Sequence, residues 1–395
     1  MPIESYDVVV IGGGIHGVGV AQAAAARGYS VLVIEQSGLA SGTSSRSSKL
    51  IHGGLRYLEN WQFGLVKKAL HERALLLKLA PDLVKLQPFF VPIYAHSYRR
   101  PWELRTGLSL YAVLGGLHKQ SLFRRIDKSA WQQLDGLNTE GLQTVFQYWD
   151  AQTDDVALTK AVMASARALG AQLCMPATFL SAQLESNNSV INYEYQGHTT
   201  TCTARCLVNA AGPWIHQVMK RITPTCSELQ TELVQGTHIV VEGDLTQGIY
   251  YMEAPSDRRA VFAMPWKNQL LVGTTETIYH GEPSAVVPLA TERDYLLATL
   301  AQYFPQYKTI DSQTIVHEFA GLRVLPSGDG TPFSRPRDTL LHVDRHSTPR
   351  LLTIYGGKLT AYRATATAVM DTLSLSLPRR RVAADTATLP LHPVE

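Results

Sequence analysis

A glycine-rich pattern near the amino terminus constrains the fold more than any other feature. Residues 6–11 read YDVVVI, a short β-branched run typical of a strand buried on both faces. Gly12, Gly14 and Gly17 follow with the G-x-G-x-x-G spacing, and an alanine-rich helical segment ends at Gly28. Residues 29–35 (YSVLVIE) then read as a second parallel strand. The pattern predicts an α/β protein with a Rossmann-type βαβ unit.

This motif predicts a dinucleotide site. Its first glycine allows a tight turn, the second lets a pyrophosphate approach the backbone, and the third lets helix and strand pack closely. The pyrophosphate would lie at the helix amino terminus, where unpaired N–H groups and the helix dipole favour an anion. Glu35 ends the second strand, where it would accept hydrogen bonds from ribose hydroxyls and disfavour the 2′-phosphate of NADP. The motif alone leaves FAD, NAD and a turn that binds nothing all open.

Composition narrows the class of protein. The 395 residues include 45% hydrophobic and 17% charged residues, as in a globular enzyme of two domains or of one large domain with a sizeable insertion. The net charge of +3 is too small to predict a nucleic-acid partner. The four cysteines lack zinc-ligand spacing and no secretory signal precedes them, which predicts reduced thiols, no metal site and a cytoplasmic protein. Local basic clusters such as Arg99–Arg100 and Arg124–Arg125 indicate either solvated surface or peripheral contact with the inner face of the cytoplasmic membrane.

Residues 41–59 (SGTSSRSSKLIHGGLRYLE) form a polar segment dense in hydroxyl and N–H donors. Such a run suits phosphates and a flavin ring, although a solvated loop has the same composition. The segment resembles the FAD-dependent glycerol-3-phosphate dehydrogenases, and so do QYWDAQTDDVAL, LVNAAGPW, QGTHIVV, LLVGTTE, FAGLRVL and YGGKLTAYR, which follow in family order along nearly the whole chain. Family members usually continue into a helical carboxy-terminal domain, whereas this chain ends at TATLPLHPVE, so the resemblance is to a short form lacking that domain.

The resemblance implies a function. It implies FAD as cofactor and oxidation of sn-glycerol 3-phosphate to dihydroxyacetone phosphate, with hydride passing to flavin N5 and electrons passing on to a quinone. Two alternatives keep the flavin. One is an oxidase or dehydrogenase of an amino acid or hydroxy acid, and the other is a catalytically inactive flavoprotein that serves as a binding partner. Fold alone does not fix the substrate.

The resemblance also assigns site residues. His238 is the expected general base, since an unperturbed pKa near 6.5 suits proton abstraction around neutrality, although a lone strand histidine is usually structural. The expected catalytic set is His238, Arg323, Arg56, Tyr57 and Lys358, with Arg323, Arg337 and Lys358 holding the substrate phosphate. The expected cofactor contacts are Gly12, Gly14, Gly17, Glu35, Thr43, Ser44, Ser45, Ser48, Lys49, Leu50, His52, Gly53, Ala177, Ala211, Gly212, Trp214, Gly357, Lys358, Leu359 and Thr360.

The domain organisation is expected to be discontinuous. Residues 1–90, 145–215 and 345–395 are assigned to an FAD-binding domain, because they contain the βαβ motif, the buried run CLVNAAG and a second glycine turn before a helix. Residues 91–144 and 216–344 are assigned to an α+β substrate domain. Alternating segments such as THIVVEG and NQLLVGTTE predict a mostly antiparallel sheet there.

Overall fold

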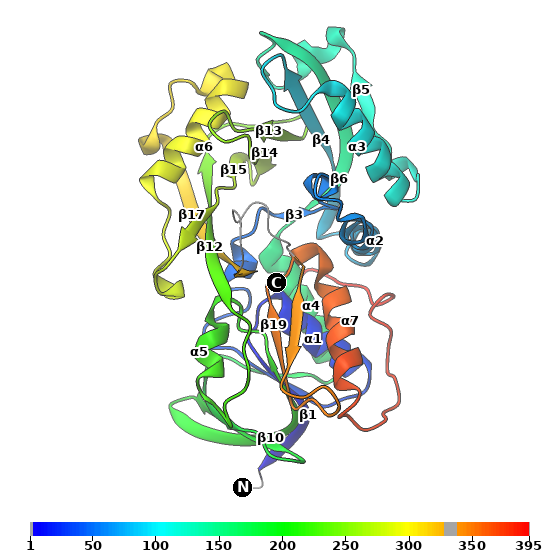
Figure 1. Ribbon diagram of the computed structural model, residues 1–395, viewed down its shortest axis with the longest axis vertical. Coiled ribbons are helices and arrows are strands. Elements are labelled where there is room, and N and C mark those ends of the chain that lie inside the picture. Colours follow the sequence, from blue (N-terminus) through cyan, green and yellow to red (C-terminus); the bar gives the residue numbers. More distant parts are fainter. Residues whose placement is uncertain (1–2, 328–337, 395) are drawn as a thin grey trace.

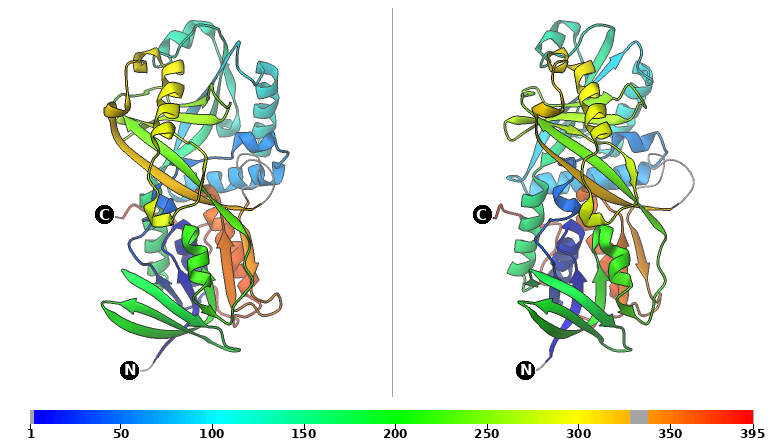
Figure 2. Two further views of the ribbon diagram at one scale, coloured as in Figure 1. Left: turned by 60° about the vertical axis from the view of Figure 1, so that its left-hand side comes forward. Right: turned by 90° about the vertical axis from the view of Figure 1, so that its left-hand side faces the viewer.

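The computed structural model describes residues 3–327 and 338–394, and within these ranges the strands form one sheet of nine strands and one of ten. Figure 1 shows the first sheet, with β1, β10 and β19, towards one end of an elongated molecule and the second sheet towards the other. The rotated views of Figure 2 keep the two sheets separated along the long axis. The predicted α/β class is confirmed.

A parallel core forms the first sheet. β1 (Glu4–Ile11) pairs in parallel with β2 (Val31–Ile34) on one side and with β10 (His198–Asn209) on the other. β7 (Gln172–Cys174) extends the sheet beyond β2, and β19 (Leu351–Tyr355) pairs in parallel with β10. The sheet is completed by β8 (Ala177–Gln183), β9 (Ser189–Tyr195), β11 (Ile222–Thr223) and β18 (Leu340–Val343). The predicted Rossmann-type unit is therefore present.

Helices cover both faces of this sheet, which explains why its central strands are apolar throughout. α1 (Ile15–Ala26), α4 (Asp155–Ala168) and α7 (Tyr362–Leu373) share one hydrophobic core with β1 and β2. The short helix α5 (Ile215–Met219) packs on the opposite face with β8 and β9. Asp154 caps α4 by accepting hydrogen bonds from the N–H groups of Val156 and Ala157, which fixes where that helix begins.

The second sheet is mostly antiparallel, as predicted. β12 (Thr231–Val241) pairs antiparallel with β15 (Gln269–Gly273), β16 (Thr277–Tyr279) and β17 (Ile315–Pro326). β4 (Val84–Tyr94) pairs antiparallel with β6 (Leu142–Thr153) and parallel with β13 (Ile249–Glu253). β3 (Leu50–Ile51), β5 (Arg124–Ile126) and β14 (Ala260–Trp266) complete it. α2 (Phe63–Leu79) and α3 (Pro101–Leu114) pack on one face and α6 (Ala290–Tyr303) packs on the other.

Sheet membership crosses the expected domain boundaries. β3 and β6 pair within the second sheet, although their residues were assigned wholly or mostly to the FAD-binding segments. β18 pairs with β19 in the first sheet, although residues 216–344 were assigned to the substrate domain. The serine-rich segment runs between the two sheets. Domain boundaries drawn along the sequence therefore do not coincide with the division of strands between the sheets. The division into domains at these residues stays a prediction.

Candidate active site

A cavity of about 450 Å³ lies between the two sheets. One wall is built at the carboxyl ends of parallel strands, by Gly12 after β1, Glu35 after β2, Ala211 after β10 and Gly357 after β19. Ligands of open α/β sheets bind at this edge. The opposite wall comes from the second sheet and includes His238 of β12. The cavity can therefore hold a dinucleotide on one side and a second reactant on the other.

The glycine turn before α1 is built for close approach of the backbone. A Cβ at Gly17 would lie 1.9 Å from the carbonyl oxygen of Gly12, so only glycine lets α1 pack here. The Glu35 carboxylate accepts hydrogen bonds from the N–H groups of Gly13 (2.6 Å) and Ser37 (2.8 Å). Glu35 thus braces the glycine turn as well as lining the cavity.

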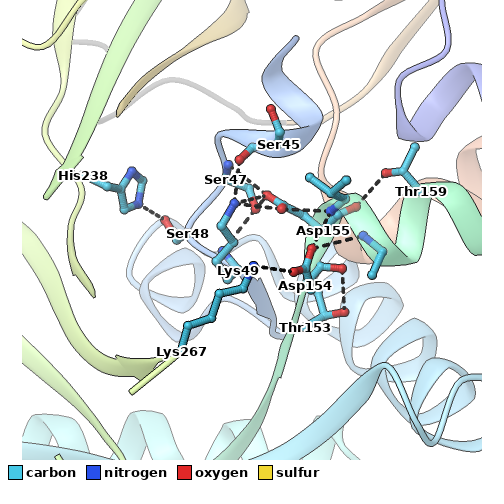
Figure 3. Close-up of polar contacts among 12 residues, drawn as sticks. Ser45, Ser47, Ser48, Lys49, Thr153, Asp154, Asp155, Thr159, His238 and Lys267 are labelled. Atoms are coloured by element: carbon cyan, nitrogen blue, oxygen red, sulfur yellow. Dashed lines mark hydrogen bonds and ion pairs between the residues drawn. The ribbon is translucent and has the colours of Figure 1, made fainter. Parts of the chain in front are cut away.

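The serine-rich segment joins the two sheets at the cavity. The Ser44 hydroxyl oxygen accepts a hydrogen bond from the Ile15 N–H of α1 (2.9 Å). The Thr43 hydroxyl donates to the Leu322 carbonyl of β17 (2.7 Å). Ser48 Oγ lies 2.9 Å from Nε2 of His238, as Figure 3 shows. Hydroxyl groups of this segment therefore connect the nucleotide wall of the cavity to the opposite wall.

The Lys49 side chain is held away from the cavity. Its ammonium lies 2.7 and 2.8 Å from the two carboxylate oxygens of Asp155 and donates to the Ser45 carbonyl, so it points towards α4 rather than into the cavity (Figure 3). A buried cation needs such a partner. Gly53 is also turned away, because its N–H donates to the Tyr111 hydroxyl (2.8 Å). Gly17 and Ser45 likewise do not line the cavity, and their expected direct contact with the cofactor is not supported.

The other expected residues within the described ranges do meet at the cavity. The structure places these side chains or backbone atoms on its walls: Gly12, Gly14, Glu35, Thr43, Ser44, Ser48, Leu50, His52, Arg56, Tyr57, Ala177, Ala211, Gly212, Trp214, His238, Arg323, Gly357, Lys358, Leu359 and Thr360. Arg337 lies outside the described residues. The roles of the residues on the walls stay proposals.

His238 is buried against Phe319, and its pKa is lowered. Only 2% of the residue is exposed, and its ring stacks on Phe319 with centroids 4.9 Å apart and planes 14° apart. Burial lowers the pKa of His238 well below 6.5, and the charges of Lys49 and Arg323 lower it further. The expected pKa near 6.5 is therefore not found. The imidazole is neutral at physiological pH and can accept a proton.

Cationic side chains converge near His238. Arg323 of β17 contacts the Glu276 carboxylate (2.5 Å) and donates to the Thr275 carbonyl (3.1 Å). Burial and the nearby Arg56 lower the pKa of Arg323 to about 10, so it remains charged at neutral pH. Lys358 lies over the Tyr57 ring, with its ammonium 3.8 Å from the centroid. This arrangement can bind an anion beside the imidazole.

Several residues of the cavity wall were missed from the sequence. They include His16, Arg259, Phe262 and Glu276. Arg259 donates to the Glu276 carbonyl (3.0 Å) and adds a further cation close to Arg323. Glu276 ends the LLVGTTE motif and Arg259 directly precedes the AVFAMPW strand, so both could have been found as charges at strand ends. His16 stands inside the glycine motif itself.

Residues 3–327 and 338–394 contain neither a metal-binding cluster nor a membrane-spanning helix. No group of three or more His, Cys, Asp or Glu side chains there is arranged to hold a metal ion. In the same part of the chain, no helix combines the length and the apolar character needed to cross a bilayer.

Comparisons with known proteins show the family of the chain. A family described as FAD dependent oxidoreductase matches residues 7–363. The chain is 36% identical over 384 residues to D-erythritol 1-phosphate dehydrogenase of Brucella abortus, covering 95% of this chain and 75% of the relative. It is 39% identical over 376 residues to glycerol-3-phosphate dehydrogenase of Pseudomonas tolaasii, covering 94% and 72%. The structure of glycerol-3-phosphate dehydrogenase from Bacillus halodurans complexed with FAD superposes with a TM-score of 0.75 at 27% identity, covering 98% of this chain and 68% of that chain.

A glycine-cradled cavity at the ends of parallel strands is typical of a dinucleotide-binding protein. Within that class, the chain belongs to the FAD dependent oxidoreductase family, among the glycerol-3-phosphate dehydrogenases and their relatives. The residues present fit FAD. Gly12 and Gly14 line the cavity without side chains, so a pyrophosphate can approach their backbone. The predicted cofactor is thus confirmed as FAD.

Proposed function

We propose that this protein oxidises sn-glycerol 3-phosphate to dihydroxyacetone phosphate. The observation that carries the proposal is the cluster of Arg56, Arg259, Arg323 and Lys358, which line the same cavity as His238. A phosphate dianion is bound best by several cationic donors, with arginine able to make paired hydrogen bonds. An amino acid or hydroxy acid carries one carboxylate and would need fewer cations. The cluster therefore favours a phosphorylated alcohol.

The reaction removes a hydride from the alcohol carbon and a proton from its hydroxyl. When bound, FAD supplies the oxidant, taking the hydride at N5. His238 is the proposed general base, because its neutral ring lies on the cavity wall and its orientation is fixed by Ser48 and Phe319. Arg323 and Lys358 are proposed to hold the phosphate, with Arg56 and Tyr57 beside it. A bound dianion would offset the effect of Arg323 on the pKa of His238, which makes the imidazole a stronger base when substrate is present.

A second candidate substrate is a longer polyol phosphate. The observation in its favour is the 36% identity to D-erythritol 1-phosphate dehydrogenase over 384 residues. Both substrates carry one phosphate and an alcohol to be oxidised, so the same cations and base would serve. The difference would lie in the space available for the additional hydroxymethylene carbon.

Anaerobic flavin reduction tests the proposal. We expect the oxidised flavin band of the purified holoenzyme to bleach on addition of glycerol 3-phosphate and to persist with glycerol or an amino acid. Bleaching that is much faster with D-erythritol 1-phosphate would transfer the assignment to the longer substrate. Bleaching by an amino acid or hydroxy acid would contradict the phosphate proposal. A flavin that no alcohol reduces would indicate a catalytically inactive binding partner.

Quinone is the proposed electron acceptor. The oxidation leaves two electrons on the cofactor, and turnover requires an acceptor that removes them. Mixing the anaerobically reduced enzyme with a soluble short-chain quinone, or with air, compares the two acceptors directly. We expect reoxidation by quinone to be the faster. If oxygen reoxidises the flavin at least as fast as quinone does, the protein is an oxidase.

A surface beside α2 and α3 is the proposed membrane contact. Trp61, Tyr98 and Trp102 are 79%, 62% and 68% exposed, respectively. An ion pair between Glu59 and Arg99 (2.5 Å) brings the segments that carry them together. Exposed aromatic rings and basic residues such as Arg105 suit a membrane–water interface with anionic lipid. Arg99 itself is engaged in ion pairs with Glu59 and Glu253, so it contributes less free charge than its sequence cluster suggested.

Sedimentation with anionic liposomes tests this contact. We expect binding that weakens at high salt and that falls at least several-fold in a Trp61→Ser/Trp102→Ser variant, because aromatic side chains anchor at the interface. Val287→Ser is the matched control, since Val287 is 62% exposed beside α6, away from α2 and α3. Binding that is insensitive to both salt and the tryptophan changes would rule the surface out.

A further inference from the structure

His16 lies between the two glycine turns of the cavity. It is the second residue of α1, inside the first glycine motif, and it lines the cavity. Its ring also fills the space over the second glycine turn, because a Cβ on Gly357 would lie 2.0 Å from Nε2 of His16. Gly357 has φ +125°, so its backbone conformation also favours glycine. The imidazole therefore sits where the turn after β1 and the turn after β19 approach each other.

Both ring nitrogens of His16 are buried, and among the residues that the structure describes neither has a hydrogen-bond partner. Burial lowers the pKa of His16 to about 4, so the ring is neutral and carries one donor and one acceptor. Leaving such groups unsatisfied is costly in a folded protein. In His238, by comparison, Nε2 contacts Ser48 and only Nδ1 lacks a hydrogen-bond partner among the described residues.

The position of His16 indicates which part of FAD its ring would contact. The first glycine turn, at Gly12 and Gly14, suits the pyrophosphate of FAD. The ribityl chain, with its hydroxyl groups, connects that pyrophosphate to the flavin ring. A hydroxyl donates one hydrogen bond and accepts others, which matches a neutral imidazole. The imidazole and the ribityl chain are thus chemically complementary.

We propose that His16 is a cofactor-binding residue whose neutral imidazole hydrogen-bonds with the ribityl hydroxyls of FAD. The proposal rests on FAD binding and not on the identity of the substrate. It assigns His16 a role that its two unsatisfied nitrogens and its place between the glycine turns support. A purely structural role would give the ring partners within the protein, and none is present in the described part of the chain.

His16→Leu tests the proposal on the holoenzyme. We expect the dissociation constant of FAD, measured from the fluorescence of flavin released on dilution, to rise about ten-fold, because a buried hydrogen-bonding partner is lost. His16→Asn keeps a donor and an acceptor and should restore most of the affinity. Because the imidazole is placed beside the ribityl chain and not the ring, the visible flavin spectrum of the remaining holoenzyme should be unchanged.

Gln22→Leu is the matched control. Gln22 is buried on the same helix and its side chain donates to Ser165 (2.9 Å), away from the cavity wall. This variant should lower the melting temperature and leave FAD affinity unchanged. If His16→Leu behaves in the same way, His16 is structural and the proposal fails.

A second measurement uses the wild-type protein, so it does not require any variant to fold. In wild-type protein labelled with ¹⁵N-histidine, the ring nitrogens of His16 should change chemical shift when FAD is removed and return when it is added back. Unchanged shifts would overturn the proposal. Because neither readout involves turnover, failure of the proposed substrate would leave both results interpretable.

Discussion

Arg323→Ala is expected to lower kcat/KM for glycerol 3-phosphate about 100-fold, mainly through a higher KM. Each charge-assisted hydrogen bond to an anion contributes roughly 1.5–3 kcal/mol, and each 1.4 kcal/mol is a factor of ten. The inhibition constant of inorganic phosphate should rise by a similar factor, because the same guanidinium would bind it. Weak turnover of glycerol, measured at high concentration, should change far less.

Glu276 also affects the result expected for Arg323→Ala, and a second variant separates its effect. The carboxylate contacts Arg323 (2.5 Å), so removing the arginine adds repulsion between Glu276 and phosphate to the loss of a contact. The double variant Arg323→Ala/Glu276→Gln separates the two effects. Arg293→Ala is the matched control, because Arg293 pairs with Glu318 (2.7 Å) and does not line the cavity. Equal losses with glycerol 3-phosphate and glycerol would remove Arg323 from phosphate binding.

His238→Asn is expected to lower kcat 100- to 10,000-fold, with roughly the flavin content of the wild type, because general base catalysis contributes rates of that order. The lowered pKa also predicts the pH profile. A base with a pKa well below 6.5 loses activity only at lower pH, so kcat/KM should show no protonation step at 6.5 due to this residue. Arg323→Ala removes one of the charges that lower this pKa, so the acid limb should move to higher pH.

His342→Asn is the control for the histidine experiment. Its Nε2 contacts Ser227 Oγ (2.9 Å), and it is not on the cavity wall, so the variant should keep kcat and flavin content. If His238→Asn retains more than a tenth of wild-type kcat, another group accepts the hydroxyl proton. Stopped-flow reduction of the flavin by substrate distinguishes loss of this step from loss of a later one.

The nucleotide wall was predictable because its determinants are local. The β-branched run before Gly12, the alanine-rich helix and the acid at position 35 each follow from adjacent residues, and the structure places them as expected. The serine-rich segment was recognised as a site from its composition. Its hydrogen bonds to both sheets could not be predicted from the sequence, because partners such as Thr43 and Leu322 are 279 residues apart.

Contacts between distant parts of the chain account for what the sequence did not reveal. Lys49 was expected at the cofactor, but its partner Asp155 lies 106 residues away and turns the ammonium towards α4. The pKa of His238 could not be anticipated, because the burial and the neighbouring charges that lower it come from other elements. Arg259, which directly precedes β14, and His16, which stands inside the glycine motif, carried weaker signals, because the cavity that brings them together is formed by distant parts of the chain.

The order of strands in the first sheet has a consequence for biosynthesis. β19, which is followed by the second glycine turn, pairs beside β10 in the parallel core, and 350 residues precede it in the chain. While the ribosome is still adding the first 340 residues, neither that strand nor its turn can close the nucleotide wall. We therefore expect a growing chain that has not yet reached this turn to bind flavin poorly.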